Sequence, residues 1–348
     1  MKFIQYGCGK MSQFLVKYAK ERGYELVGAF DNNSDLIGQD FFGVTISDVV
    51  DFDKILSRLK PDFCIIATRS TMAEIEDAMT ICAKNGVNAI STCEEAIFPW
   101  NSSPEITQRL DSLAKENDVT LTGSGYPDVF WGTLVATLTG SVQKITKITG
   151  MSSYNVEDYG LALAEGHGAG LSIAEFEKEL GQYNNLSSQD ITAKIQSGEL
   201  APSYMWNQNG WLCAKLGLTV TSQTQRCIPT THDGDLDSST LGMKIKSGDA
   251  TGMNAIITTE TAEGITIETE NIGKVYSLGE IDANHWEIEG EPNVSFDVDN
   301  PSTVELTCAT VVNRIPQLMA AEAGYVTTDQ FPNSEYNGLV LGSKSLND

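Results

Sequence analysis

The chain has 348 residues, enough for two domains of ordinary size, and its apolar fraction of 41% is sufficient for a substantial core. Its 47 acidic and 23 basic residues give a formal net charge of −24, which argues against nucleic acid or anionic lipid as a partner because basic patches bind both. The sequence contains neither a run of ~18 apolar residues nor a secretory signal at its start, so we expect no membrane association.

Strands and helices alternate over the first third of the chain. Apolar runs predict strands at residues 3–6, 25–30, 62–68, 87–91 and 119–122, and helical spacing predicts helices at 11–21, 71–85 and 103–117. Repeated strand–helix–strand units of this size predict a doubly wound parallel sheet, a Rossmann domain that we place at residues 1–128. Ligands of such sheets bind beyond the carboxyl ends of the strands. The segments that directly follow strand ends should therefore converge, and they are residues 7–12, 68–71, 92–95 and 123–127.

The pattern changes after about Trp131. Helices are predicted at 172–180, 187–197 and 203–216, followed by strands at 254–261, 265–270, 286–289 and 293–298. The Glu263-Gly264 turn between two of these strands predicts an antiparallel hairpin. We therefore expect an α+β domain at residues 129–303, with a mainly antiparallel sheet that serves substrate binding and dimerisation. A last helix at about 304–323 begins a C-terminal segment, residues 304–348, that we expect to return to the first domain.

The glycine loop at residues 7–12 has the spacing of a dinucleotide-binding fingerprint. Gly7 permits the tight turn, Gly9 lets the backbone approach a pyrophosphate, and the following helix supplies free N–H groups. Ser12 replaces the third glycine. Because the loop lies between a strand and a helix, dinucleotide binding is favoured over a structural turn. We assign the nicotinamide dinucleotide to Gly7, Cys8, Gly9, Lys10, Met11, Asp31, Asn32, Thr68, Arg69, Thr92, Cys93 and Gly125.

Asp31 closes the second strand about 20 residues after the loop, where an acidic residue accepts hydrogen bonds from the ribose hydroxyls. This position favours NAD over NADP, and no arginine follows at Asn32, Asn33 or Ser34 to bind a 2′-phosphate. These neutral residues would still tolerate NADP, so both cofactors stay open. The alternative role of Asp31 is that of a turn-forming residue.

Two carboxylates, Glu94 and Glu95, follow the strand that ends near Ser91. Neighbouring carboxylates repel, so one of the two pKa values should rise and provide a proton acceptor near neutral pH, or an anion that holds an amine or iminium. The alternative is an exposed acidic pair near a helix start. Cys93 is interpreted as a core thiol rather than an acylating nucleophile, because no histidine is close in sequence.

Two further glycine-rich segments are candidates for ligand contact. Gly123 and Gly125 permit close backbone approach to the nicotinamide end of a cofactor, or form a plain hinge. Residues 165–172 surround His167 with glycines and predict a mobile substrate loop or a flexible connector. A weakly polar substrate pocket would take its walls from aromatic and apolar residues, namely Tyr126, Trp131, Met151, Tyr154, His167, Met205 and Trp206.

The seven cysteines show no metal-ligand spacing, and none of the three histidines lies near a cysteine in sequence. We therefore expect free thiols, a cytoplasmic location and no metal site.

These motifs resemble those of 2,4-diaminopentanoate dehydrogenase and the related native amine dehydrogenases. The similarity lies in G-x-G-x-M at the start, V-G-A-F-D before Asn32, N-G-V-N-A-I-S-T-C-E-E at 85–95 and G-S-G-Y-P at 123–127, and it extends to V-N-R-I-P at 312–316. These families share the two-domain layout of dihydrodipicolinate reductase. The chain departs from them at Tyr126-Pro127-Asp128, where the family usually has asparagine-proline-glycine, so no particular substrate is predicted.

The resemblance implies NAD(P)-dependent oxidative deamination of a small amine and the reverse reductive amination of an aldehyde or ketone with ammonia. It implies that Glu94 or Glu95 contacts the amine nitrogen, and we favour Glu94. Our hypothesis is that this glutamate removes a proton from the substrate ammonium and that its carboxylate then stabilises the iminium, which water attacks. The resemblance also implies a homodimer. Two alternatives stay open: another imine or carbonyl reductase on the same scaffold, and a dinucleotide-binding sensor without turnover.

Overall fold

A computed structural model describes residues 1–336 and 338 of the chain. The chain divides into two compact units, which we describe separately. Unit 1 comprises Met1–Thr133 and the segment that begins at Ser302, and unit 2 comprises Leu134–Pro301. The first unit therefore extends past Asp128, where the sequence placed its end, and includes the π-helix Pro127–Thr133.

Unit 1 contains an eight-stranded sheet in the order β16-β7-β6-β5-β1-β2-β4-β3. Neighbouring strands are parallel except β3 and β4, which confirms the predicted Rossmann architecture. Because β2 and β5 flank β1 on opposite sides, the ligand crevice of such a sheet lies at the carboxyl ends of β1 and β5. The strands are β1 (Lys2–Tyr6), β2 (Glu25–Asp31), β3 (Asp40–Phe41), β4 (Val44–Asp48), β5 (Phe63–Ile66), β6 (Asn88–Ser91), β7 (Thr120–Gly123) and β16 (Gly324–Tyr325).

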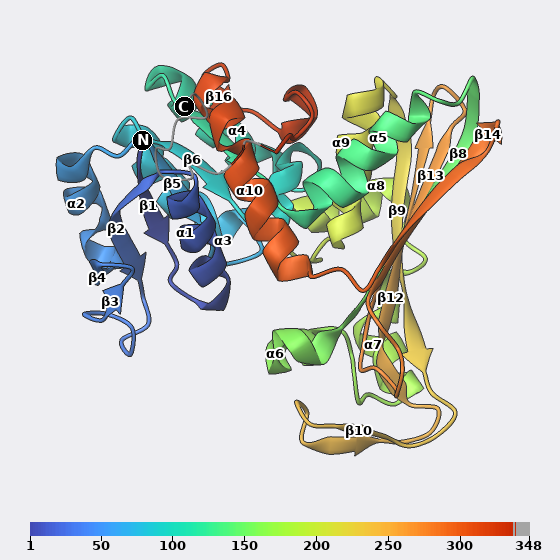
Figure 1. Ribbon diagram of the computed structural model, residues 1–348. Helices are drawn as coiled ribbons and strands as arrows, with labels where there is room; N and C mark the ends of the chain where they lie inside the picture. The colour runs from blue at the N-terminus through green and yellow to red at the C-terminus, as the bar shows by residue number, and fades with distance from the viewer. Residues whose placement is uncertain (337, 339–348) are drawn as a thin grey trace, which may run out of the picture. The chain divides into compact units, whose positions relative to one another are not determined.

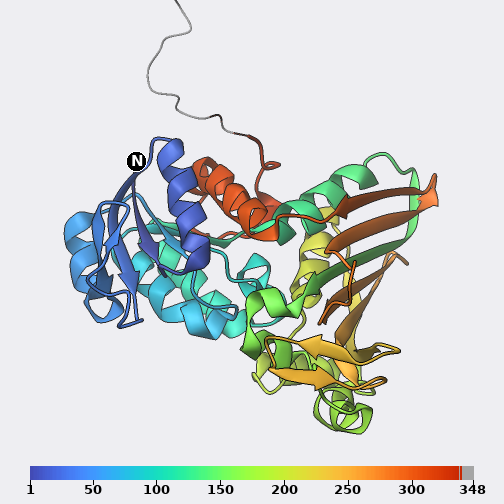
Figure 2. The ribbon, with the colours of Figure 1, turned by 60° about the horizontal axis from the view of Figure 1, so that its bottom comes forward.

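Helices cover both faces of this sheet, as its buried strands β5, β6 and β7 require. One core cluster joins α2, α3 and α4 to the sheet, and the other joins α1 and α10. Helices α1 and α10 lie side by side (Figure 1 and Figure 2), so the end of the described chain packs on its beginning. The helices are α1 (Lys10–Glu21), α2 (Phe52–Leu59), α3 (Met72–Lys84), α4 (Pro104–Glu116) and α10 (Thr303–Ala320).

Unit 2 is built on a six-stranded sheet in the order β15-β14-β8-β13-β12-β9. Only the central pair β8 and β13 is parallel, so the prediction of a mainly antiparallel sheet is confirmed, as is the hairpin of β12 and β13. The strands are β8 (Lys144–Asn155), β9 (Val220–Thr231), β12 (Ala250–Thr261), β13 (Thr266–Lys274), β14 (Ala283–Glu291) and β15 (Val294–Asp299), with a separate small pair of β10 (Leu236–Ser238) and β11 (Met243–Ile245).

One face of the unit 2 sheet packs against helix α9. Asn209 anchors this helix, since its side-chain amide donates to Thr259 Oγ1 at 3.1 Å and accepts from Thr269 Oγ1 at 3.0 Å. The unit's helices are α5 (Leu134–Thr139), α6 (Leu161–Gly166), α7 (Ile173–Glu179), α8 (Ser188–Gln196) and α9 (Tyr204–Leu216).

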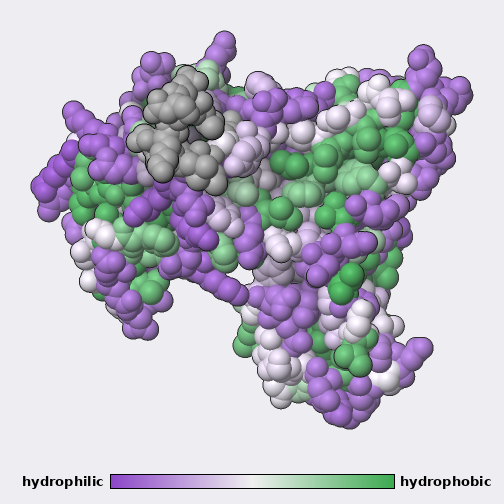
Figure 3. All heavy atoms as spheres, viewed as in Figure 1, coloured by the Kyte–Doolittle hydropathy of each residue, from purple (hydrophilic) through white to green (hydrophobic). Residues whose placement is uncertain are grey.

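The surface of the face seen in Figure 3 is largely hydrophilic, and hydrophobic residues gather over the region of α5. Among the described residues, no helix is both long and apolar enough to cross a membrane.

We expect Gly123→Ala to destabilise unit 1. A Cβ at this last residue of β7 would lie 2.4 Å from the backbone carbon and oxygen of Ala96, so the turn that contains Ala96 would have to move. Overpacking of this kind lowers the free energy of unfolding by about 1–3 kcal/mol. Thermal and denaturant unfolding would measure the loss. Gly166→Ala is the control, because its Cβ would meet no atom within 4 Å. Equal stability of Gly123→Ala and this control would contradict the prediction.

Candidate active site

The loops that follow β1, β5, β6 and β7 meet at one edge of the unit 1 sheet, which confirms the predicted convergence. Gly7 packs against Ala67, because a Cβ at Gly7 would lie 2.3 Å from the Ala67 carbonyl oxygen. The Glu95 N–H donates to the Ser70 carbonyl at 3.2 Å. The Ser124 N–H donates to the Ser91 carbonyl at 2.9 Å. Each loop thus touches the next one along this edge.

The two glycines of the first loop differ in whether the fold itself requires glycine at their positions. Gly7 has a φ of +90° and no room for a side chain, so the fold itself requires glycine there. Gly9 has an ordinary extended backbone, and a Cβ there would meet no atom within 4 Å. The space beside Gly9 therefore stays open toward the helix that begins at Lys10.

The start of α1 fits the pyrophosphate of a dinucleotide. No side chain caps this helix and its first turn has no acidic residue, so its N–H groups and the positive end of its dipole are available to an anion. Ser12 is buried, and its hydroxyl donates to the Gly9 carbonyl at 2.5 Å. A small residue is accommodated in place of the third glycine.

Asp31 forms the turn that the sequence offered as its alternative role, and its binding of a ribose stays a prediction. Its carboxylate accepts from the Cys8 N–H at 2.7 Å and from the Asn33 N–H at 2.8 Å, so it braces the glycine loop and forms a turn. A carboxylate has about four acceptor positions, and two backbone bonds leave capacity for ribose hydroxyls.

The other predicted cofactor residues differ in what they offer. Lys10, Asn32, Thr68 and Arg69 are exposed, and Arg69 lies 3.9 Å from Glu74. Met11 packs at the edge of the core. Cys8 and Cys93 are buried thiols, and burial raises the pKa of Cys8 to about 12 and that of Cys93 well above its ordinary value. Raised pKa values disfavour the thiolate, which agrees with the interpretation of Cys93 as a core thiol. Cys8 bonds Asp31 through its backbone N–H and the Phe30 carbonyl through its thiol.

Glu95 is held in place by three hydrogen bonds. Its carboxylate accepts from the Met72 N–H at 2.5 Å and from the hydroxyls of Ser102 and Ser103 at 2.6 and 2.5 Å. Met72 is the first residue of α3, so Glu95 caps this helix. The carboxylate of Glu95 thus serves the structure of the loop.

Glu94 is left as the carboxyl group that chemistry can use. Its pKa is raised because the surrounding protein desolvates it, although a hydrogen bond with the Ser70 side chain acts in the opposite direction. The sequence anticipated a raised pKa but attributed it to repulsion between the two glutamates. Burial is the main cause, because the carboxylate of Glu95 is bound to the start of α3 and to two serines.

Ser70 is a site residue that the sequence analysis did not single out. It follows β5 at the expected ligand edge, so its position gave a usable indication. Its carbonyl accepts from Glu95 and its side chain bonds Glu94, so one residue fixes both members of the acidic pair.

The glycines after β7 serve packing within the protein. Gly123 lies against the Ala96 backbone, and a Cβ at Gly125 would approach Thr307 of α10 at 3.1 Å. The structure thus accounts for Gly123 without a ligand.

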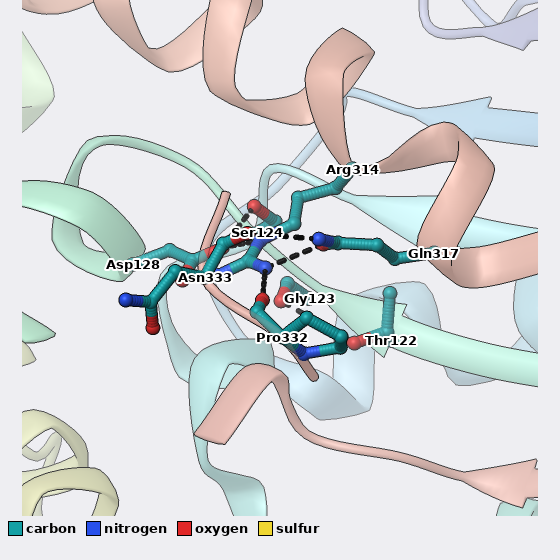
Figure 4. Close-up of polar contacts among 8 residues, drawn as sticks. All are labelled: Thr122, Gly123, Ser124, Asp128, Arg314, Gln317, Pro332 and Asn333. Carbon is teal, nitrogen blue, oxygen red and sulfur yellow. Dashed lines mark hydrogen bonds and ion pairs between the residues drawn. The ribbon is translucent and has the colours of Figure 1, made fainter. Parts of the chain in front are cut away.

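Two predicted pocket residues of unit 1 lie together just after these glycines. The Tyr126 ring contacts Trp131 edge-on, with centroids 5.9 Å apart, and stacks on Phe130 at 4.3 Å. Asp128, which lies between Tyr126 and Trp131 in the sequence, forms a buried ion pair with Arg314 of α10 (Figure 4).

The predicted pocket residues of unit 2 divide between the two faces of its sheet. Tyr154 and His167 are in contact, with Tyr154 Oη 2.6 Å from His167 Nε2. Met151 precedes Tyr154 by three positions on the regular strand β8, so its side chain points to the opposite face. The structure therefore does not group Met151 with Tyr154. Met205 and Trp206 are buried in α9.

His167 is a neutral, hydrogen-bonded residue. Its Nδ1 lies 2.8 Å from the Leu163 carbonyl, which can only accept, so Nε2 accepts the Tyr154 hydroxyl proton. Burial lowers the pKa of His167, which keeps the ring uncharged.

The segment around His167 is packed rather than an open loop, contrary to the expectation of a mobile segment. A Cβ at Gly168 would meet the Phe176 ring at 2.8 Å, and the Gly170 N–H donates to the Ala250 carbonyl at 2.8 Å.

Within the described residues, no three His, Cys, Asp or Glu side chains are grouped as metal ligands would be.

Comparisons with known proteins agree with this architecture. The model of the 2,4-diaminopentanoate dehydrogenase C-terminal domain matches residues 130–336. The chain is 25% identical to a 2,4-diaminopentanoate dehydrogenase of Acetoanaerobium sticklandii, over 95% of this chain and 93% of that protein.

Solved structures extend the comparison. The amine dehydrogenase of Mycobacterium smegmatis is 35% identical, with 97% of both chains covered and a TM-score of 0.83. A probable dehydrogenase of Thermotoga maritima, at 12% identity over 94% of this chain and 92% of that chain, shares the fold with a TM-score of 0.57. The family model and the mycobacterial structure together show that this chain belongs to the 2,4-diaminopentanoate dehydrogenase family of amine dehydrogenases, which are oxidoreductases.

Proposed function

We propose that the protein is an NAD(P)-dependent amine dehydrogenase in which Glu94 is the catalytic acid–base residue. The observation that carries this assignment is the unequal use of the two glutamates. Glu95 is saturated by three donors, whereas Glu94 has a raised pKa at the carboxyl edge of the sheet that also presents the glycine loop. The substrate is a small amine, or in reverse an aldehyde or ketone with ammonia.

The residues divide the work as follows. A nicotinamide held at the glycine loop would supply the hydride acceptor for oxidation of the amine-bearing carbon and the hydride donor for the reverse reaction. Glu94 removes the proton that makes the substrate amine an ammonium and passes this proton to solvent. Its regenerated carboxylate then stabilises the cationic iminium that forms when hydride leaves the amine-bearing carbon. Its raised pKa places the proton transfer closer to neutral pH than an ordinary glutamate would. Ser70 orients the carboxyl group of Glu94, and Glu95 fixes the loop after β6 by binding the start of α3.

We propose NAD as the preferred cofactor. The negative charge of Asp31 would repel a 2′-phosphate, and Asn32 and Asn33 provide no compensating cation. The assignment of the pocket to Tyr126, Trp131 and the unit 2 residues stays a prediction.

We also propose a homodimer in a reducing cytoplasm. The unit 2 sheet ends in the exposed edges β15 and β9, which a partner copy could cover, and sedimentation equilibrium would test this. All seven cysteines are free and buried, as suits a reducing compartment.

Glu94→Gln should abolish amine turnover while Glu95→Gln retains it. Glutamine at 94 cannot exchange a proton, so kcat for deamination and for reductive amination should fall by about 10²–10⁴-fold. Glutamine at 95 loses acceptor capacity for its three donors, so Glu95→Gln should lower the free energy of unfolding by about 1–3 kcal/mol. The measurement is a panel of small amines, and of carbonyls with and without ammonia, with NAD and NADP.

The panel also separates the alternatives. Carbonyl reduction that does not depend on ammonia would indicate another reductase, and tight cofactor binding without turnover would indicate a sensor. Unchanged amine turnover in both glutamine variants would refute the role of the acidic pair.

Glu94→Gln should also make the protein more stable at alkaline pH. Because the pKa of Glu94 is raised on folding, the folded state holds its proton more tightly than the unfolded chain, and stability is lost as pH rises from about 4.5 through the folded-state pKa. The variant should therefore melt at a higher temperature than the parent at pH 8, and the difference should shrink toward pH 4.5. Exposed Glu25→Gln serves as the control. A difference that stays constant with pH would contradict this prediction.

Gly9→Ala should weaken cofactor binding without unfolding the apo-protein. The added methyl group meets no protein atom within 4 Å but occupies the space proposed for the pyrophosphate. We expect the Kd for NADH, measured by fluorescence, to rise at least tenfold (about 1.4 kcal/mol) with an unchanged apo-protein Tm. Gly7→Ala is the matched comparison and should lower Tm, because its Cβ would lie 2.3 Å from the Ala67 oxygen. Wild-type affinity in Gly9→Ala would exclude this loop as the pyrophosphate site.

A further inference from the structure

The ion pair between Asp128 and Arg314 is almost completely enclosed, with side-chain exposures of 0% and 1%. It is bidentate: Arg314 Nε donates to Oδ2 at 2.7 Å and Nη2 donates to Oδ1 at 2.6 Å. The Ser124 hydroxyl donates to the same carboxylate at 2.7 Å. Arg314 Nη1 donates to the Pro332 carbonyl and to Gln317 Oε1 (Figure 4). Nearly every polar atom of the pair is therefore engaged.

Stabilisation of the fold does not by itself explain a buried ion pair. The cost of desolvating two charges offsets most of their attraction, and apolar residues of similar volume often stabilise a core as well. The bidentate geometry does provide direction, because the two N–H groups of a guanidinium donate to a carboxylate in one plane. The pair joins α10 and the Pro332 segment to the turn after β7, so it fixes the orientation of that turn.

The turn fixed in this way holds two aromatic candidates for substrate contact. Asp128 lies within the π-helix Pro127–Thr133, a rare conformation that occurs often at functional sites. Tyr126 precedes it, and its N–H donates to Thr307 Oγ1 of α10 at 3.2 Å. Trp131 follows it, three residues along the same turn.

Trp131 contains a polar group that the described residues do not satisfy. Its indole Nε1–H is buried and meets no acceptor within the described part of the chain. A buried donor without a partner costs free energy, so a partner is expected from outside the chain. The loop of Trp131 adjoins the Glu94 loop, since Ser124 donates to the Ser91 carbonyl and Gly123 packs on Ala96. A substrate carbonyl oxygen has the chemistry of the missing acceptor.

We propose that Asp128 and Arg314 are positioning residues that aim the Trp131 indole N–H at the oxygen of a carbonyl substrate. The pair acts through the π-helical turn and does not touch the substrate. The proposal rests on the proposed amine dehydrogenase function, because reductive amination begins with a carbonyl compound. It also gives a role to Asp128, whose charge is otherwise costly to bury.

The test uses the full-length protein labelled with 5-fluorotryptophan. Fluorine NMR resolves the five tryptophans, and Trp131→Phe identifies the Trp131 resonance. Arg314→Lys keeps the charge but loses the bidentate fork, so it should shift or broaden the Trp131 resonance and leave the other four in place. Asp128→Asn is the second variant, which keeps the shape of the side chain. Arg109→Lys is the control, because Arg109 also bridges two helices of unit 1 through Glu76, at 2.8 Å, but at the exposed surface.

Steady-state kinetics supply the second readout. Well below Tm, Arg314→Lys and Trp131→Phe should raise KM for the carbonyl at least tenfold, with KM for NADH within twofold of the parent. An unmoved Trp131 resonance in both pair variants, or activity losses that only follow the folded fraction, would overturn the proposal. If the parent converts no amine or carbonyl in the panel, the proposed function fails, while the resonance still decides whether the pair positions Trp131.

Discussion

The hydrogen bonds to the carboxylate of Glu95 are the interactions on which the candidate active site depends. Three donors converge on it, from the start of α3 and from two adjacent serines before α4. Because each bond to a carboxylate is stronger than one between neutral groups, the loop after β6 has one stable arrangement. The neighbouring Glu94 is consequently turned to another environment, where burial and Ser70 determine its protonation. A structural carboxylate thus sets the environment of the residue to which we assign the chemistry.

This division of labour explains the limit of the sequence argument for the site. Two consecutive glutamates after a strand predict an acidic site, and their position at the ligand edge follows from the parallel sheet. Our choice between the two glutamates depends on Met72, Ser102 and Ser103, which bind Glu95, and the sequence does not reveal that these residues are its neighbours. The same applies to Gly123, whose neighbour Ala96 is close only in three dimensions. Local pattern predicts residue types at a site, but tertiary contacts assign their roles.

The fold was more accessible because it depends on periodicity. Buried strands such as β5 are apolar throughout, and the helices between them repeat at helical spacing, so the doubly wound sheet follows from the pattern. The strands and helices that we did not predict in unit 1 include β3, β4, β16, the π-helix Pro127–Thr133 and α2. Helix α2 nevertheless has apolar residues at Phe52, Ile55, Leu56 and Leu59. Strands β3 and β4 are short and have few apolar residues, so they gave no strand signal, and α2 directly after them was not recognised either.

The alternation of side chains between the two faces of a strand also limits the prediction of pocket residues from sequence. Apolar residues near one another in sequence look equivalent, yet on β8 an odd separation places Met151 and Tyr154 on opposite faces. In the turn after β7, by contrast, the π-helix brings Tyr126 and Trp131 into contact around a buried charge. An aspartate in this position would be costly without Arg314, so the two positions must be read together. Asp128 is therefore best understood as one half of a pair, whose other half, Arg314, lies 186 residues further along the chain.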